Sequence, residues 1–460
     1  MVIIETDESL QSFLTRLRTD DFVFDIVLTD AKKHPCNNDV SVLFFYFLND
    51  DSTWCFPMVH VDCILPMSTL ISWYRLISEE LRLSVARKFV VDKKMCNEVL
   101  GEDFGFHDLN VMNYLEVGTS VDVEDITSSS KVFIESTFRE QCNLNKSIPI
   151  YHLAQMFRER VDRFDLDEIP KIDKSFEFLN NVALTRFSQL ESIGMAVDVP
   201  LFLSYFGEEH SADVKNGLVF SQYNLFTSTG RPSNRFGGVN YAALNKEDGS
   251  RKSFVSRYGS DGMLVMIDYS AFHPRLISRL ANYTLSLETN PYELLAKHLF
   301  GAARPSPPQI AAAKGKFFLQ LYGGIRPDVM SMPYFQAVQT YIDHRWEFFT
   351  TNGYVETPIY FRKIKSCHID NPTPNKLFNY ILQAYETEVA VQTLGNILEY
   401  LKGRLTRPIL YTYDSLLYDV HKSDGLGTVQ SIRDIMIDGK FPVKMYAGKS
   451  YDEMSQIILK

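Results

Sequence analysis

The sequence lacks several features that assign a chain quickly to a common class. Its six cysteines are scattered and form no Cys-x-x-Cys pair, which argues against a disulfide framework or a zinc ribbon and favours a reducing compartment. Its longest apolar run, residues 42–48, is far shorter than the about 20 residues that a membrane helix needs. No basic segment opens the chain, so we expect no signal peptide, no membrane partner and a cytoplasmic location.

Positive charge is also scarce. The chain has 47 lysines and arginines against 57 acidic residues, a net charge of −10. Proteins that coat nucleic acid are usually basic, so we expect any such contact to be local. The best candidate is the stretch 221–257, which holds six cations and two anions. A hydrophobic content of 45% over 460 residues fits a soluble protein of about two to four domains.

The most distinctive stretch runs from Ala311 to Gly324. Read as a helix, it places Lys314, Phe318 and Tyr322 four residues apart, so the three side chains share one face. A cation on that face suits a triphosphate, and an aromatic ring one turn later suits a base or a sugar. The same spacing also fits an amphipathic helix whose lysine reaches into solvent, so this stretch alone leaves both interpretations open.

Two strand-like apolar runs each end in an aspartate. The run 263–267 is followed by Asp268, and the run 409–413 is followed by Asp414. Two acids at adjacent strand ends can hold two divalent ions about 4 Å apart. A single aspartate at a strand end is more often a turn residue. Two of them, on either side of the Lys314 helix in sequence, favour phosphoryl-transfer chemistry.

In this order the two acids and the helix resemble motifs A, B and C of the family A DNA polymerases, and the segment 227–231, Thr-Ser-Thr-Gly-Arg, resembles another segment of that family. The resemblance implies that Asp268 and Asp414 hold two Mg²⁺ ions, with the Tyr269 backbone beside them. It implies that Lys314 neutralises the phosphates and protonates pyrophosphate as a general acid.

The resemblance also implies contacts with nucleotide and with primer-template DNA. Phe318 would pack on the incoming base of a dNTP, and Tyr322 would lie at the template turn. Asn379 and Gln383, four residues apart in an expected helix at 375–401, would contact the minor-groove acceptors that occur in every base pair. Arg231 would lie along the primer duplex. The other expected DNA-binding residues are Asn234, Arg251 and Lys252.

Residues 1 to about 125 have an α/β pattern that weakly resembles the 3′–5′ exonuclease domain of the same family. We expect strands at 22–28, 40–48, 54–59 and 89–91, and helices at 70–83 and from 108. The chemistry of that domain needs several carboxylates around two metal ions. Asp25 stands at the first motif, and Asp92 and Asp108 are candidate remnants, but Val27 replaces a glutamate. Losing an oxygen ligand weakens such a site, so we expect a degenerate, inactive domain.

The polymerase pattern itself departs from the family at three places. His273, expected in the nucleotide site, replaces a glutamate that helps exclude the ribose 2′-hydroxyl. Ile310 replaces an arginine, whose role Arg304 or Lys316 could take. The segment 413–415, Tyr-Asp-Ser, replaces His-Asp-Glu, and its serine is closer to single-subunit RNA polymerases.

We therefore expect an α/β and α+β multidomain protein with a right-hand polymerase fold. Its expected activity is template-directed addition of dNMP to a primer 3′ end, in phage DNA replication in the host cytoplasm. Only 27 positions separate Pro200 from Thr227, where the family has a long helical thumb, so we expect a processivity or thumb-replacing partner. Two alternatives stay open: an RNA polymerase of the single-subunit type, and a non-catalytic DNA-binding subunit. The expected domains are a ribonuclease H-like exonuclease-type domain (1–175), a connecting helix and vestigial thumb (176–226), a first palm part (227–285), fingers (286–370) and a second palm part (371–460).

Overall fold

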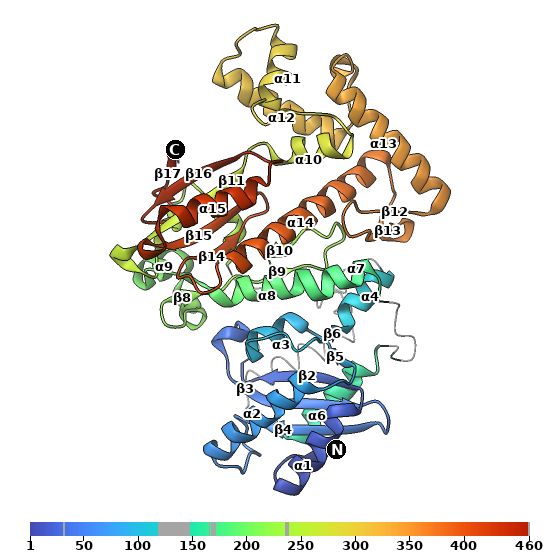
Figure 1. Ribbon diagram of the computed structural model, residues 1–460, viewed down its shortest axis with the longest axis vertical. Coiled ribbons are helices and arrows are strands. Elements are labelled where there is room, and N and C mark those ends of the chain that lie inside the picture. The colour runs from blue at the N-terminus through green and yellow to red at the C-terminus, as the bar shows by residue number, and fades with distance from the viewer. Residues whose placement is uncertain (31–32, 118–147, 165, 167–171, 235–238, 459–460) are drawn as a thin grey trace. The chain divides into compact units, whose positions relative to one another are not determined.

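The computed structural model describes residues 1–30, 33–117, 148–164, 166, 172–234 and 239–458 (Figure 1). The chain forms two compact units. Unit 1 comprises residues 1–116, 120–192 and 209–222, and unit 2 comprises residues 117–119, 193–208 and 223–460. The domain edge expected at residue 175 falls inside unit 1, because the helix that follows it packs there: its Glu191 pairs with Lys94 at 2.6 Å.

A mixed six-stranded sheet of order β1-β4-β3-β2-β5-β6 forms the centre of unit 1. Strands β2, β3 and β4 are antiparallel neighbours, whereas β5 runs parallel to β2 and β6 runs parallel to β5. Every residue of β2 is buried, as expected of a central strand covered on both faces. All four expected strands are confirmed. The strands of unit 1 are β1 (Val2–Ile3), β2 (Phe22–Leu28), β3 (Val40–Phe47), β4 (Ser52–Pro57), β5 (Lys88–Val90), β6 (His107–Asp108) and β8 (Leu218–Val219).

The helices of unit 1 follow the expected pattern, with one irregularity. The connecting helix expected from residue 176 starts earlier, at Lys174, passes through a π-helical segment at Glu177–Ala183 and ends at Ile193. Gly194 follows with φ of 68°, the left-handed conformation that commonly ends a helix. The helices are α1 (Asp7–Thr19), α2 (Met67–Leu83), α3 (Lys93–Leu100), α4 (Leu109–Val117), α6 (Ile150–Val161), α7 (Lys174–Phe176) and α8 (Leu184–Ile193).

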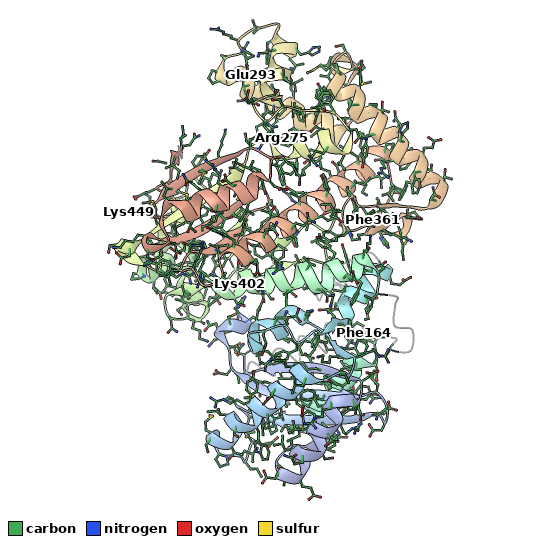
Figure 2. All side chains as sticks on the ribbon, viewed as in Figure 1. Phe164, Arg275, Glu293, Phe361, Lys402 and Lys449 are labelled. Atoms are coloured by element: carbon green, nitrogen blue, oxygen red, sulfur yellow. The ribbon has the colours of Figure 1, made fainter. Side chains whose placement is uncertain are left out.

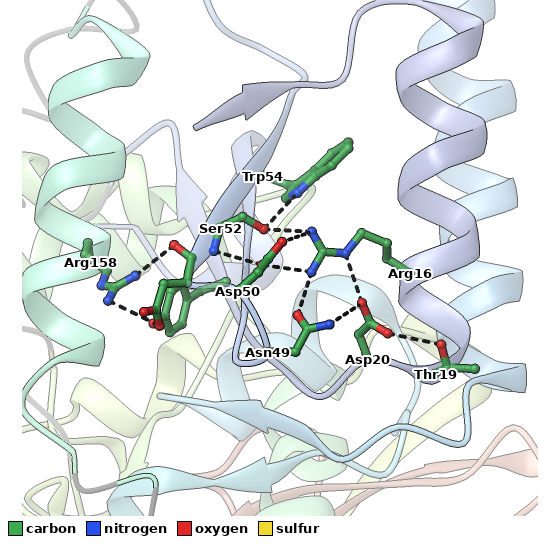
Figure 3. Close-up of polar contacts among 10 residues, drawn as sticks. Arg16, Thr19, Asp20, Asn49, Asp50, Ser52, Trp54 and Arg158 are labelled. Atoms are coloured by element: carbon green, nitrogen blue, oxygen red, sulfur yellow. Dashed lines mark hydrogen bonds and ion pairs between the residues drawn. The ribbon is translucent and has the colours of Figure 1, made fainter.

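Arg16 fastens helix α1 to the turn between β3 and β4 (Figure 3). Its Nε donates to Asp20 at 3.0 Å, and Nη1 donates to the Ser52 hydroxyl at 2.8 Å. Both terminal nitrogens donate to the two oxygens of Asp50 at 2.9 Å, a bidentate geometry. These hydrogen bonds hold the pKa of Asp50 at about 2. Arg16 therefore links helix α1 to the start of strand β4 and stabilises this part of unit 1.

Unit 2 is built on an antiparallel five-stranded sheet of order β14-β15-β11-β16-β17. The strands expected at 263–267 and 409–413 are confirmed as β11 and β14. The strands of unit 2 are β7 (Met195–Ala196), β9 (Tyr223–Asn224), β10 (Ser233–Asn234), β11 (Gly262–Tyr269), β12 (Tyr354–Glu356), β13 (Lys363–Lys365), β14 (Arg407–Tyr411), β15 (Ser415–His421), β16 (Val443–Gly448) and β17 (Ser455–Ile457).

Seven helices accompany this sheet in the described part of unit 2. The expected helices at 311–324 and 375–401 are confirmed as α12 and α14. Over residues 199–227, all described, the longest helix is the eight-residue α9, so no long helical hairpin occurs there. No helix among the described residues has the length and apolar content to cross a bilayer. The helices are α9 (Val199–Phe206), α10 (Phe272–Leu280), α11 (Pro291–Phe300), α12 (Pro307–Gly323), α13 (Pro333–Asn352), α14 (Pro374–Tyr400) and α15 (Gly425–Ile437).

Candidate active site

A cavity of about 490 Å³ lies in unit 2, where the end of β11 meets residues of α10, α12 and α14. It brings together residues that are far apart in sequence, including both predicted metal-binding aspartates and the predicted nucleotide-binding face of α12. Its lining is formed by Arg231, Asp268, Tyr269, Ser270, Ala271, Phe272, His273, Asn290, Tyr292, Ile310, Lys314, Phe318, Tyr322, Glu386, Asp414 and Lys444.

The two aspartates are neighbours because β11 and β15 pair antiparallel. This pairing sets Asp268 opposite Ser415, and the Tyr269 N–H donates to the Asp414 carbonyl at 2.9 Å. Burial, and then the charge of Asp414, raises the pKa of Asp268 to about 6. Burial and the charge of Glu386 raise the pKa of Asp414. The site thus holds carboxylate charge that the protein only partly neutralises, and oxygen donors of this kind suit a hard divalent cation.

The backbone beside each aspartate is strained. Tyr413, directly before Asp414, has φ of 67°, and Ala271, at the start of α10, has φ of 52°. Non-glycine residues in this region cost about 1–3 kcal/mol each. Arg275, labelled in Figure 2 and 4% exposed, secures the second turn: its guanidinium donates to the carbonyls of Ser270 (3.1 Å) and Thr289 (2.8 Å). Strain held in place by such contacts is typical of functional sites.

Helix α12 presents the predicted face to the cavity. Lys314, Phe318 and Tyr322 all line it, which confirms that they share one side of the helix. The rings of Phe318 and Tyr322 stack, with centroids 6.0 Å apart and planes 7° from parallel. The Lys314 ammonium lies 5.8 Å from the centre of the Tyr292 ring. A neighbouring stripe anchors the helix in the core and so fixes which face is open; it consists of Ala313, Phe317 and Leu321, all 0–1% exposed.

Glu386 is the main site residue that the sequence analysis missed. Its side chain is 1% exposed, and its Oε1 lies 3.0 Å from His273 Nε2. Its Oε2 lies 2.9 Å from Arg231 Nε. The available signal was position, because Glu386 follows Gln383 by one turn of α14 and so shares its side of the helix. Lys444 was missed too; it pairs across β11 and β16 with Asp268.

The predicted DNA-binding arginines already have partners within unit 2. Arg231 was expected along the duplex, but it lines the cavity, where its guanidinium lies 4.0 Å from the Tyr413 ring centre. Arg251 donates to the Leu244 carbonyl at 2.7 Å and lies over the ring of Tyr451 at 4.4 Å. Each guanidinium group therefore has contacts within the protein itself, and the structure does not test its predicted contact with DNA.

The other predicted DNA-binding residues lie in more open positions. Lys252 has a side chain 51% exposed and lies 4.0 Å from Asp452. Asn379 and Gln383 are half-buried on α14, and in the described chain the buried Oδ1 of Asn379 accepts no hydrogen bond. Asn234 pairs through its backbone with β9; its side chain, and Arg235 from the basic stretch, fall outside the described residues.

The predicted exonuclease acids each have a structural role in unit 1. Asp25 pairs with Arg160 at 2.8 Å, and Asp92 caps α3. Asp108 accepts two backbone N–H bonds, at 2.8 and 3.0 Å, and burial raises its pKa to about 7. Their oxygens do not lie within 4.8 Å of one another as a group of three possible metal ligands. Among the described residues, one group of side chains does meet this criterion, and it contains none of these three acids. Their interpretation as metal-site remnants thus gains no support from the geometry.

That other group is His34, Cys36 and Glu98 in unit 1. His34 Nδ1 accepts the Cys36 N–H at 3.2 Å, so a neutral ring carries its proton on Nε2, the atom that faces Glu98 at 3.9 Å. Glu98 is buried beside Glu191, whose charge Lys94 neutralises, and burial raises the pKa of Glu98 well above its usual range.

The comparisons with known proteins identify the fold. No protein-family model matches this chain, and no curated protein matches its sequence. Among solved structures it is similar to the POL domain of Pol1 from M. smegmatis in complex with DNA primer-template and dNTP. The two chains are 15% identical, with a TM-score of 0.68 over 98% of this chain and 99% of the other. At this identity the likeness shows the fold alone, a mixed α/β multidomain fold like that of a Pol I polymerase domain.

Proposed function

We propose that this protein is a template-directed DNA polymerase that adds dNMP to the 3′ end of a primer. The observation that supports this most is the meeting of Asp268, Asp414 and the Lys314 face of α12 in one cavity. The likeness in fold to a POL domain solved with primer-template and dNTP agrees with it. Its small size, its short thumb segment and its departures from the family motifs lead us to associate the protein with phage DNA replication in the host cytoplasm.

Two Mg²⁺ ions are proposed to bind Asp268 and Asp414, with the Tyr269 backbone beside them. The residues fit such ions, because both carboxylates line one cavity, the charge of Asp414 helps to raise the pKa of Asp268, and the pKa of Asp414 is raised as well. Bound Mg²⁺ supplies electrostatic stabilisation of the charge on the transferred phosphoryl group and its leaving group.

The side chains of α12 are proposed to bind and orient the dNTP. Lys314 neutralises triphosphate charge and donates a proton to the departing pyrophosphate, as its position on the open face allows. Phe318 and Tyr322 offer stacked rings against which the base and sugar can pack. Holding the reacting atoms in line is the main contribution that protein side chains make to phosphoryl transfer.

Primer-template DNA and dNTPs are the proposed partners. Asn379, with its free Oδ1, and Gln383 are proposed to contact the minor groove at the primer end, and Lys252 is proposed to contact a phosphate. Contacts with DNA phosphates are also proposed for Arg251 and Asn234. Because residues 199–227 hold only one short helix, a processivity or thumb-replacing protein is proposed to retain the duplex. Unit 1 is proposed to be an exonuclease-like domain without activity.

RNA synthesis is the second candidate. It is favoured by His273 and Ser415, which replace two glutamates. Ser415 is buried, and its hydroxyl bonds to the Thr412 hydroxyl, so it brings no charge to the site. A third candidate, a non-catalytic DNA-binding subunit, would use the same fold without chemistry.

Primer extension with Mg²⁺ and either dNTPs or rNTPs separates these candidates. We expect extension with dNTPs, and no excision of a mismatched 3′ end. Asp414→Asn should lower the rate at least about a thousandfold, because it removes a charged metal ligand. The matched control is Asp438→Asn. Asp438 is an exposed acid of unit 2 with a left-handed backbone conformation, and asparagine adopts that conformation readily. Extension only with rNTPs would favour the second candidate, and an Asp414→Asn protein as active as the control would contradict catalysis at this site.

A further inference from the structure

The cavity lacks two carboxylates that its sequence motifs lead one to expect, yet it contains an unexpected one. His273 and Ser415 stand where the resemblance places glutamates. Glu386 enters the same cavity from a different element, helix α14, and is 1% exposed. An ionised carboxylate is buried this deeply only when it is paired, so its partners indicate its role.

The side chains around Glu386 form a continuous series of contacts along the cavity wall. The Tyr322 hydroxyl lies 3.0 Å from His273 Nδ1, and His273 Nε2 lies 3.0 Å from Glu386 Oε1. Arg231 Nε lies 2.9 Å from Glu386 Oε2. Arg231 Nη2 also donates to Glu386 Oε1 at 3.4 Å. His273 Nε2, Arg231 Nε and Glu386 Oε2 approach one another at ion-pair distances but do not have the alignment of a hydrogen bond, so these contacts are electrostatic.

This series of contacts links three helices and one turn through the carboxylate of Glu386. Tyr322 belongs to α12, His273 to α10 and Glu386 to α14, while Arg231 follows the turn at residues 227–230. Arg231 also lies over the ring of Tyr413, the residue before Asp414. Without the carboxylate, the guanidinium would lose a hydrogen-bond acceptor and the imidazole would lose its close charged neighbour, so neither side chain would keep one orientation toward the cavity.

We propose that Glu386 is the positioning residue of the nucleotide site, a carboxylate supplied from α14 in place of the one missing from α10. It acts through His273 and Arg231, which it holds in fixed orientations against the sugar and phosphates of the bound nucleotide. This inference rests on the proposed polymerase function. It predicts that the carboxylate can be moved back to α10 with recovery of activity.

Single-nucleotide incorporation by the full chain tests this, with kcat and KM measured for dNTP and rNTP. Glu386→Gln keeps the shape of the side chain and removes its charge. We expect KM for dNTP to rise about tenfold, and the preference for dNTP over rNTP to fall about fivefold, because a charged hydrogen-bond acceptor is lost. The control is Glu399→Gln on the same helix, whose side chain is 63% exposed; it should leave both values unchanged.

The decisive variant combines Glu386→Gln with His273→Glu. It should return KM and the sugar preference to within about threefold of the wild-type values. His273→Glu alone places two carboxylates together, so its KM should be higher, and its preference for dNTP lower, than those of Glu386→Gln and of the double variant. A purely structural role for Glu386 predicts losses that add, without rescue. The inference is overturned if Glu386→Gln keeps wild-type constants, or if the double variant shows no recovery. If the wild-type protein extends no primer with any nucleotide, the proposed function itself fails and the inference falls with it.

Discussion

Asp268 carries a charge that the folded, metal-free protein disfavours. Burial, followed by the charge of Asp414, raises its pKa from 3.8 to about 6. Below pH 3.8 the group is protonated in the folded and unfolded states alike. Between pH 3.8 and 6 the unfolded chain releases the proton while the folded chain retains it, so stability falls as pH rises. Above pH 6 the full penalty is present.

Asp268→Asn should remove this penalty and stabilise the metal-free protein. A shift of about two pKa units corresponds to about 3 kcal/mol. The carboxylate is only half-buried, and solvent screening reduces the expected gain to about 1–2 kcal/mol. Urea unfolding in EDTA measures it: the gain should be present at pH 8, shrink at pH 5 and vanish near pH 4. Millimolar Mg²⁺ should stabilise the wild type more than the variant, because ligand binding favours the folded state.

Two outcomes would refute this reasoning. One is an Asp268→Asn protein that is less stable than the wild type at pH 8 in EDTA. The other is a gain of the same size at pH 5, since a penalty of ionisation must disappear with the charge. Asp261→Asn, near the start of the same strand, is the control. Lys422 lowers the pKa of Asp261, so this change should bring no gain.

Two further predictions concern unit 1 and the duplex. Arg160→Ala should destabilise unit 1 by about 3 kcal/mol in thermal unfolding, because it removes the cation that faces the buried Asp25. Adding Asp25→Asn to the same protein should recover part of this loss. Losses that simply add would contradict the pairing. Single-encounter extension by the isolated chain should give short products, because the described residues 199–227 provide little surface to hold phosphates, and runs of hundreds of nucleotides would disprove this.

Local patterns in the sequence determined the secondary structure and one functional face. The segments 22–28 and 40–48 predicted strands, which the structure confirms as β2 and β3. The four-residue spacing of Lys314, Phe318 and Tyr322 predicted a common face, which the structure confirms. These inferences succeeded because they depend only on the 3.6-residue and two-residue periods of the backbone.

Tertiary structure decided which side chains meet. Antiparallel pairing of β11 with β15 brings Asp414 beside Asp268, although 414 − 268 = 146 residues separate them, and no local period encodes that pairing. Packing of α14 turns Glu386 into the cavity, where its Oε2 lies 2.9 Å from Arg231 Nε. In unit 1 an unforeseen arginine, Arg160, pairs with Asp25. Charges act over distances in space rather than along the chain, so the partners of a carboxylate, and with them its chemistry, become known only from the fold.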